Sequence, residues 1–227
     1  MKDIFIHPSA VVDPGSRIGP RSKIWHFTHV QSGARIGSDC VLGQGVYIGQ
    51  DVQIGKGVKI QNNVSVFHGV RLEDGVFVGP HVCFTNDKYP RAINDDGSPK
   101  GSDDWTLVPT LVKYGAAIGA NATILGGISI GRWALVGAGA VVVSDIPDHG
   151  LVMGSPGRLA GYVCICARRL LKKDQGLICP ACRRQYVVED RLAKGSADGR
   201  ARSVAKGPRI LEKDPRPRKR SQLESNS

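Results

Sequence analysis

The chain has 227 residues and a formal net charge of +11, with 29 glycines and few aromatic residues. This composition favours many short strands joined by tight turns over a helical bundle. Residues 1–163 are close to neutral, and most of the positive excess lies in 191–227. A nearly neutral main body argues against nucleic acid as its partner.

The apolar stretches of the chain and its cysteines indicate the cellular compartment in which the protein is expected. Residues 1–10 hold no apolar run typical of a signal peptide, and no stretch approaches the length of a membrane span. We therefore expect a cytoplasmic protein. In that compartment the six cysteines are expected as thiols or metal ligands rather than disulfides.

A period of six residues dominates the N-terminal two thirds of the chain. A large apolar residue recurs every six positions from Ile6 to Phe84, and a small or β-branched residue follows four positions after each of them up to Val82. This period fits neither an amphipathic helix nor simple strand alternation. It predicts a chain that turns a corner every six residues, with glycine, asparagine and aspartate at the corners. Three sides close a coil of about 18 residues, and stacked coils form a solenoid of parallel strands.

The pattern stops at Phe84 and resumes in a new register from Val112 to Val142. Residues 85–111 hold three prolines, five acidic residues and Trp105, so we predict an inserted loop outside the solenoid. Loops of this length in compact folds are usually functional or disordered. The predicted organisation is a solenoid domain at 1–163, with an active-site loop at 85–111, a cysteine segment at 164–190 and a basic tail at 191–227.

The 18-residue coil predicts which side chains lie above one another, about 4.8 Å apart. One corner column contains Ser32, Gln50, His68 and Asn86, and another contains Phe27, Gly45, Asn63 and His81. Polar side chains therefore gather where the predicted loop leaves the solenoid. Corner asparagines such as Asn62 and Asn63 also serve turn geometry and amide ladders, so a structural interpretation stands beside the functional one.

Four short sequence motifs are more specific than the six-residue repeat. They are 25–27 (WHF), 60–66 (IQNNVSV), 84–92 (FTNDKYPRA) and 119–124 (GANATI). Together with the hexads they resemble the left-handed β-helix acyltransferases. Within that class they resemble the 3-N-acetyltransferases of UDP-2-acetamido-3-amino-2,3-dideoxyglucuronate or of dTDP-3-amino-3,6-dideoxyhexoses. The resemblance covers about residues 4–163. It implies an all-β, left-handed parallel β-helix, and a homotrimer with active sites between subunits.

The same resemblance implies an enzyme that transfers an acetyl group from acetyl-CoA to the 3-amino group of a nucleotide-linked sugar, for surface polysaccharide biosynthesis. We interpret the UDP-glucuronate derivative as the substrate and the dTDP-hexose as the alternative. The Asn that matches Asn86 lies at the amine and the thioester in that family. Catalysis is expected from Asn86 and His68, and substrate binding from Asn62, Asn63, His81 and Arg91.

Coenzyme contacts are also implied by the resemblance. The Gly-Ala-Gly turn of the family matches residues 137–139 with Ala138, and Ala120 lies one coil earlier. The terminal Gly-x-Pro-x-Arg string matches residues 154–158, where Arg158 is expected to meet coenzyme phosphate. Val143-Ser144 stands where many relatives carry a Thr-Lys pair. Ser144 is expected as a coenzyme contact, but one cationic contact is missing here.

The reaction sets physical requirements. The amine must be unprotonated and held at about 3 Å from the thioester carbon, the oxyanion needs a donor, and the amine proton needs an acceptor. An Asn amide orients groups but is a poor base. His68 or His81 is one candidate base, and the departing coenzyme thiolate is the alternative.

Four cysteines at the C-terminal side have the spacing of a metal site. Cys164-x-Cys166 is followed, after twelve residues, by Cys179-x-x-Cys182. Paired cysteines around a hairpin favour a structural four-thiolate zinc ribbon. Reduced free thiols or a redox pair are the alternatives. Residues 191–227 are rich in Lys, Arg, Ser, Gly and Pro, and we predict disorder there.

Two other functions fit parts of the sequence. A zinc carbonic anhydrase on the same helix needs histidines from neighbouring coils, and no His lies between Val82 and His149. A non-enzymatic scaffold would bind a partner through the zinc ribbon and the basic tail.

Overall fold

The structure is a computed structural model, and it describes residues 3–189 and 209–213. Its regular elements are all β-strands, which confirms the predicted all-β class for these residues. No helix within the described ranges is long and apolar enough to cross a membrane.

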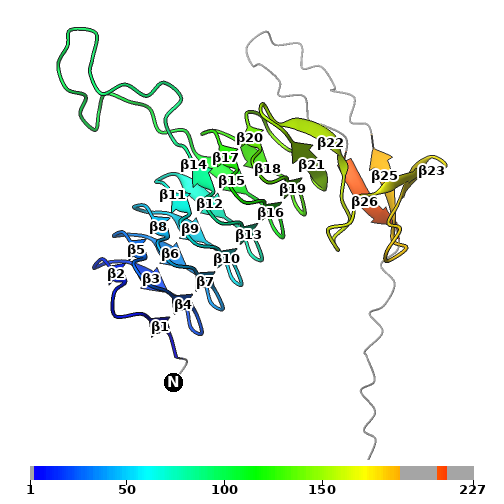
Figure 1. The fold of residues 1–227 in the computed structure, drawn as a ribbon, viewed down its shortest axis with the longest axis horizontal. Helices are drawn as coiled ribbons and strands as arrows, with labels where there is room; N and C mark the ends of the chain where they lie inside the picture. The colour runs from blue at the N-terminus through cyan, green and yellow to red at the C-terminus, as the bar shows by residue number, and fades with distance from the viewer. Residues whose placement is uncertain (1–2, 190–208, 214–227) are drawn as a thin grey trace, which may run out of the picture.

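Three sheets of short parallel strands run the length of the solenoid (Figure 1). Sheet A contains β1 (Phe5–Ile6), β4 (Lys23–Ile24), β7 (Val41–Leu42), β10 (Lys59–Ile60), β13 (Phe77–Val78), β16 (Ala117–Ile118), β19 (Leu135–Val136), β21 (Gly150–Met153) and β22 (Arg158–Tyr162). Sheet B contains β2 (Val11–Val12), β5 (His29–Val30), β8 (Tyr47–Ile48), β11 (Ser65–Val66), β14 (Cys83–Phe84), β17 (Thr123–Ile124) and β20 (Val141–Val142). Sheet C contains β3 (Arg17–Ile18), β6 (Arg35–Ile36), β9 (Gln53–Ile54), β12 (Val70–Leu72), β15 (Thr110–Val112) and β18 (Ser129–Ile130).

The register of these sheets confirms the predicted coil. Lys23 pairs with Val41 and Val41 with Lys59, so these neighbouring strands of sheet A are 18 residues apart. Among the described strands of sheets A to C, only β22 runs antiparallel, against β21. We call the turns between the sheets the A–B, B–C and C–A corners.

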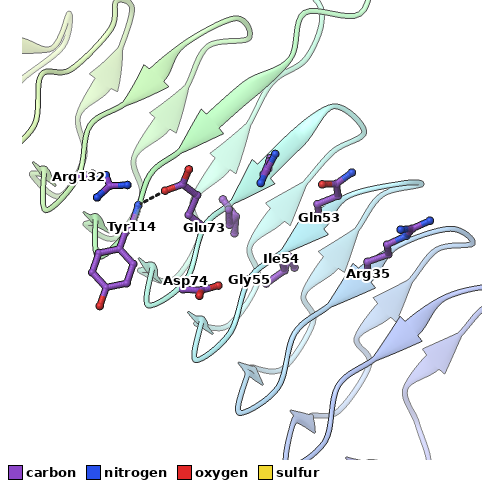
Figure 2. Close-up of a pocket in the computed structure, with 10 residues that line it drawn as sticks. Arg35, Gln53, Ile54, Gly55, Glu73, Asp74, Tyr114 and Arg132 are labelled. Carbon is purple, nitrogen blue, oxygen red and sulfur yellow. Dashed lines mark hydrogen bonds between the residues drawn. The ribbon is translucent and has the colours of Figure 1, made fainter.

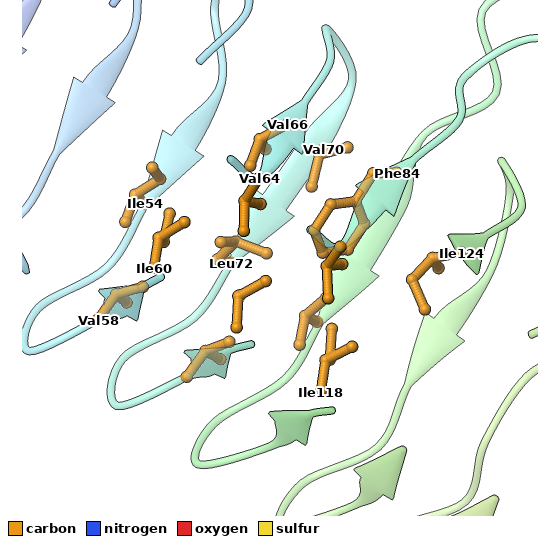
Figure 3. Packing of buried hydrophobic residues seen from close by; sticks show 14 of the residues in the cluster. Ile54, Val58, Ile60, Val64, Val66, Val70, Leu72, Phe84, Ile118 and Ile124 are labelled. Carbon is orange, nitrogen blue, oxygen red and sulfur yellow. The ribbon is translucent and has the colours of Figure 1, made fainter. Parts of the chain in front are cut away.

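The interior of the solenoid is a continuous apolar column (Figure 3). The second residue of each two-residue strand points inward, and Ile60, Phe84 and Ile118 are fully buried. The small residue of each hexad, such as Val64, is buried beside them. Each buried large side chain contributes about 1.5–3 kcal/mol, so the six-residue pattern both forms and stabilises the coil.

The inserted loop leaves after β14 and extends away from the solenoid (Figure 1). Its neck is closed by hydrogen bonds from the Val108 N–H to the Asn86 carbonyl and from the Thr110 N–H to the Gly69 carbonyl, both 3.1 Å. The predicted limit of 111 is wrong by two residues, because β15 starts at Thr110. Thr110 is buried and takes the small inward position of the hexad that ends at Val112.

The cysteine segment forms a separate antiparallel sheet of β23 (Leu171–Lys173), β24 (Gly176–Ile178), β25 (Gln185–Glu189) and β26 (Arg209–Lys213). The predicted disorder of 191–227 is wrong at β26, which pairs with β25 along its length. Ile210 is buried and gives this short segment of the basic tail an apolar anchor. The rest of the predicted tail lies outside the described residues.

Candidate functional site

The B–C corner brings together the two residues predicted to be catalytic. Asn86 is half-buried, and its Nδ2 donates a hydrogen bond to the His68 carbonyl oxygen at 3.1 Å. This contact over 18 residues confirms the predicted stacking. The His68 Nδ1 lies 2.7 Å from the Gln50 carbonyl oxygen. Because a carbonyl only accepts, Nδ1 carries the proton, and Nε2 of the neutral ring keeps the lone pair that a base requires.

A pocket of about 370 Å³ joins Asn86 to the inserted loop. Its lining residues are Asn86, Asp87, Arg91, Lys100, Gly101, Ser102 and Trp105. The pocket places Arg91 near Asn86. The sequence did not predict Lys100 and Trp105 as site residues, because the loop has no repeat from which their positions could be derived.

The A–B corner holds the other predicted substrate residues. Asn62 is exposed, and its Oδ1 accepts a hydrogen bond from the Gln44 N–H at 3.0 Å. Asn63 and His81 have φ angles of 58° and 60°, which place both in the left-handed region that asparagine tolerates well. The His81 N–H continues this corner by donating to the Asn62 carbonyl. These residues therefore build the turn, whatever else they contact.

The predicted coenzyme residues are divided among three places. Ala120 and Ala138 lie on the A–B corner, where the Gly139 N–H donates to the Ala120 carbonyl at 2.8 Å. Ser144 follows β20 at the B–C corner, and Arg158 begins β22 opposite Met153. Arg158 is exposed. Within one chain the predicted coenzyme residues do not all lie side by side, because the A–B and B–C corners are on opposite edges of sheet B.

Sheet B presents a different outer face from its neighbours. Sheet C carries outward arginines in β3, β6 and β12, and sheet A carries outward lysines in β4 and β10. The outward residues of the sheet B strands are Val11, His29, Tyr47, Ser65, Cys83, Thr123 and Val141. None of them is Lys, Arg, Asp or Glu. Exposed apolar side chains flank this face at its corners: Phe27, Phe67, Leu125 and Val143. Such a surface is typical of a protein interface.

A larger open pocket of about 530 Å³ lies on sheet C near the C–A corner (Figure 2). Arg35, Gln53 and Arg132 line it, and the Glu73 Oε2 accepts a hydrogen bond from the Tyr114 N–H at 2.8 Å. None of the predicted site residues lines this pocket.

The four cysteines of the C-terminal segment converge on one point. The Sγ atoms lie 3.4 Å apart for Cys164 and Cys182, and 3.5 Å apart for Cys166 and Cys179. All four Sγ atoms lie within 4.8 Å of one another. Tetrahedral zinc with bonds of about 2.3 Å places sulfur atoms about 3.8 Å apart, whereas a disulfide needs about 2.05 Å. The arrangement therefore fits a four-thiolate metal site.

Tyr186 connects this cysteine centre to the last coil of the solenoid. Its hydroxyl lies 3.0 Å from the Cys164 Sγ, and its ring lies 5.2 Å from the ring of His149. His149 is buried, and its Nδ1 lies 2.9 Å from the Val163 carbonyl oxygen. Burial lowers the pKa of His149 below its usual 6.5, so its ring is kept neutral and donates from Nδ1.

Comparisons with known proteins agree with the repeat. The family profile "Bacterial transferase hexapeptide (six repeats)" matches residues 15–50, and "Hexapeptide repeat of succinyl-transferase" matches 33–68 and 115–144. Residues 69–114, between the two later matches, contain the inserted loop.

Among curated proteins, dTDP-3-amino-3,6-dideoxy-alpha-D-galactopyranose 3-N-acetyltransferase of Aneurinibacillus thermoaerophilus is 44% identical over 186 residues. That alignment covers 82% of this chain and 92% of the relative. Serine acetyltransferase of Escherichia coli strain K12 is 35% identical over 88 residues, covering 38% of this chain and 31% of that protein.

Among solved structures, PerB from Caulobacter crescentus in complex with CoA and GDP-perosamine gives a TM-score of 0.45 at 25% identity. It covers 70% of this chain and 57% of that one. The identity to the Aneurinibacillus enzyme along nearly its whole length is decisive: the chain belongs to the hexapeptide-repeat acyltransferases.

Proposed function

We propose that this protein uses acetyl-CoA to acetylate the 3-amino group of a nucleotide-linked amino sugar. The position of Asn86 at the neck of the loop, held by His68, is the observation that carries this proposal. The relative with 44% identity is named for a dTDP-linked 3-amino-3,6-dideoxyhexose. We therefore propose that class of acceptor, in place of the UDP-glucuronate derivative that the sequence motifs first suggested.

The geometry at Asn86 suits a positioning role in acyl transfer. Its Nδ2 already donates to the His68 carbonyl, so its Oδ1 is the group that accepts from the attacking amine and aims the nitrogen lone pair. The amine nitrogen then bonds to the thioester carbon, the carbon–sulfur bond breaks, and coenzyme A leaves as a thiolate. The amine proton goes to His68 Nε2 or directly to that thiolate.

We infer that sheet B faces the three-fold axis of a homotrimer. Its uncharged face, with apolar side chains at both edges, would then be covered by two other copies. In this arrangement the A–B corner of one subunit meets the B–C corner of the next. The two divided sets of predicted residues would then face each other across the interface, with Asn62, His81 and Ala120 on one side and His68, Asn86 and Ser144 on the other.

The trimer is tested by Phe67→Glu, which places a charge at the apolar edge of sheet B, where Phe67 is 37% exposed. We expect light scattering to show a smaller species and acetyl transfer to be lost. Tyr114→Glu, at a residue of the C–A corner that is 43% exposed, should change neither. A Phe67→Glu protein with the wild-type mass and activity would show that sheet B is not the interface.

The reaction is tested by thiol release from acetyl-CoA with dTDP-linked and UDP-linked 3-amino sugars as acceptors. Asn86→Ala should lower kcat at least ~10²-fold with little change in stability, since a preorganised hydrogen bond is lost. Asn94→Ala, in the same loop but outside the pocket, should retain kcat. Unchanged kcat and KM in Asn86→Ala would place the active site elsewhere, and a wild-type protein without turnover would favour the scaffold alternative.

His68→Asn distinguishes the two destinations of the proton. If His68 is the base, kcat should fall by a factor comparable to that of Asn86→Ala, and the acidic limb of the pH–rate profile should change. If the thiolate takes the proton, that limb should persist, because it reports the amine of the substrate.

We also propose that the cysteine centre holds one structural zinc ion through Cys164, Cys166, Cys179 and Cys182. Zinc would supply a cross-link between the first cysteine pair, next to the solenoid, and the turn between β24 and β25. Elemental analysis of protein purified without chelator should find one zinc per chain. Protein that is fully folded and free of zinc would contradict the proposal.

A further inference from the structure

A second small pocket, of about 280 Å³, opens at the A–B corner three coils before the loop. We call it the corner slot. Its lining residues are Trp25, His26, Val41, Gly43, Gln44, Ile60, Gln61 and Asn62. None of them carries a Lys, Arg, Asp or Glu side chain, and none was assigned to the reacting centre except Asn62. The slot therefore needs its own explanation.

The floor of the corner slot is a flat aromatic surface. The rings of Trp25 and His26 lie within 11° of parallel, with centroids 6.0 Å apart. Phe5 packs on Trp25 at 5.2 Å, and His7 packs on His26 at 3.6 Å, both from the preceding coil. Trp25 keeps 36% of its surface exposed.

A glycine keeps the space above this floor open. Gly43 follows Trp25 by 18 residues and therefore lies directly above it, without a side chain to fill the slot. A Cβ at this position would collide with the Asn62 Oδ1, which accepts the Gln44 N–H. The hydrogen bond that forms the corner and the empty slot thus depend on the same glycine.

Primary amides form the far side of the slot. Gln61 and Asn62 stand one further coil away, and Gln44 lies at the corner between them and the aromatic floor. Because the Asn62 Oδ1 is bound to the Gln44 N–H, the Asn62 amide presents its NH₂ group as a donor. Amides and an aromatic face together match a flat heterocycle, which stacks on one side and pairs donors with acceptors along its edge. A coenzyme phosphate would instead need cations.

We propose that the corner slot binds the pyrimidine base of the nucleotide-linked sugar. This inference rests on the proposed function and adds the place where the nucleotide is recognised. The slot begins in the coil of β4, and Asn86 lies in the coil of β13 and β14, three strand spacings or about 14 Å along the axis. The ribose and diphosphate of an extended nucleotide bridge such a distance.

The two ends of the substrate would then be held by different subunits. The corner slot lies on the A–B corner and Asn86 on the B–C corner, which meet only between neighbouring copies in the proposed trimer. The base would be stacked by one subunit while its sugar amine is aimed by the next.

Calorimetric titration of the full-length protein with dTDP tests this directly. Trp25→Ala should weaken dTDP binding roughly 10- to 100-fold, the usual effect of losing a base-stacking ring. Trp25→Phe should keep most of the affinity, because it retains an aromatic face. Gln61→Ala should weaken binding without touching the solenoid interior. Tyr114→Ala, which removes an exposed ring at the C–A corner, should leave dTDP binding unchanged.

Inorganic pyrophosphate serves as the probe without a base, and its binding should be the same in all these variants. In turnover, Trp25→Ala should raise KM for the nucleotide sugar while kcat and KM for acetyl-CoA stay near wild type. If the wild-type enzyme acetylates a dTDP-amino sugar and Trp25→Ala and Gln61→Ala both bind dTDP normally, the slot assignment is overturned and the proposed function stands. If the wild type neither binds dTDP nor turns over the sugar, the proposed function itself fails.

Discussion

The solenoid and the cysteine module are both built from β-strands, yet they are stable for different reasons. In the solenoid each coil buries its apolar residues against the coils on either side, so one continuous cluster runs from Ile24 to Val152. In the module the buried cluster consists of Cys164, Leu170, Cys179, Tyr186 and Ile210. Repetition supplies the first region with a large core. The core of 164–189 and 209–213 is small, so the proposed zinc and the contact with the solenoid would supply stability that this core lacks.

The two regions differ in how much a cross-link would stabilise them. A coil that is flanked by identical coils gains little from one, because its neighbours already fix its register. The turn between β24 and β25 has no repeating neighbours, and the proposed zinc would tie its Cys179 and Cys182 to the cysteine pair before β23. The following predictions test this contrast, from the largest expected effect to the smallest.

A charge in the interior of the solenoid should have the largest effect. Ile60→Asp buries a carboxylate without a partner at a fully buried position, and we expect a loss of at least about 3 kcal/mol of unfolding free energy. Guanidinium titration followed by circular dichroism measures this loss. Lys59→Gln, the outward neighbour on β10, should stay within about 0.5 kcal/mol of wild type; equal effects would mean that the interior is not apolar and closed.

Loss of one thiolate should dismantle the module and spare the solenoid. Cys179→Ser removes a fully buried candidate ligand, so zinc content should drop from one ion per chain to nearly none. Limited proteolysis should then cut within 164–189 while residues 3–163 stay intact. Cys83→Ser on β14, outside the cysteine centre, should retain the zinc. Cleavage within the solenoid of Cys179→Ser would show that the two regions are not independent.

Removing the hydroxyl of Tyr186 should have a smaller effect on zinc binding at the same cysteine centre. Tyr186→Phe removes the group that lies 3.0 Å from the Cys164 Sγ, and loss of a hydrogen-bonding group beside a metal ligand weakens metal binding about 10-fold or more. Competition with a chromogenic chelator measures the zinc affinity. Tyr114→Phe is the matched control, and an unchanged affinity in Tyr186→Phe would assign that hydroxyl to packing alone.

The smallest expected effect is a pH dependence at the contact between the two regions. His149 has a folded-state pKa below its unfolded value of 6.5 because it is buried. The unfolded state therefore binds the proton first as pH falls, and the stability that is fully present above about pH 6.5 should decline below it. His149→Asn tolerates the φ of 61° and keeps a donor for the Val163 carbonyl, but it does not titrate.

Denaturant unfolding at several pH values compares the two proteins, each normalised to its value above neutral pH. As pH falls below about 6.5, the unfolding free energy of the wild type should decline more steeply than that of His149→Asn, by up to about 1.4 kcal/mol per pH unit. Parallel curves would exclude His149 as the source of the pH dependence.

The sequence predicts the solenoid well because each coil is specified by a pattern within its own residues. Every coil obeys the same hexad, so the stacking of Asn86 on His68 follows from counting residues. The loop pocket could not be predicted in this way. Lys100 and Trp105 reach Asn86 through a fold of the loop that no period describes. The strand β26 was missed because its apolar pair, Ile210 and Leu211, lies inside a strongly basic stretch and finds its partner strand only in three dimensions.

The inserted loop leaves and re-enters the solenoid at the same corner, with ladder pairing intact on both sides of its neck. Phe84 pairs with Val66 before the loop, and Thr110 pairs with Val70 after it. The length of the loop is therefore uncoupled from the phase of the coils. Mutation can lengthen, shorten or exchange this segment without disturbing the scaffold, so the loop is free to diverge while the solenoid keeps its geometry.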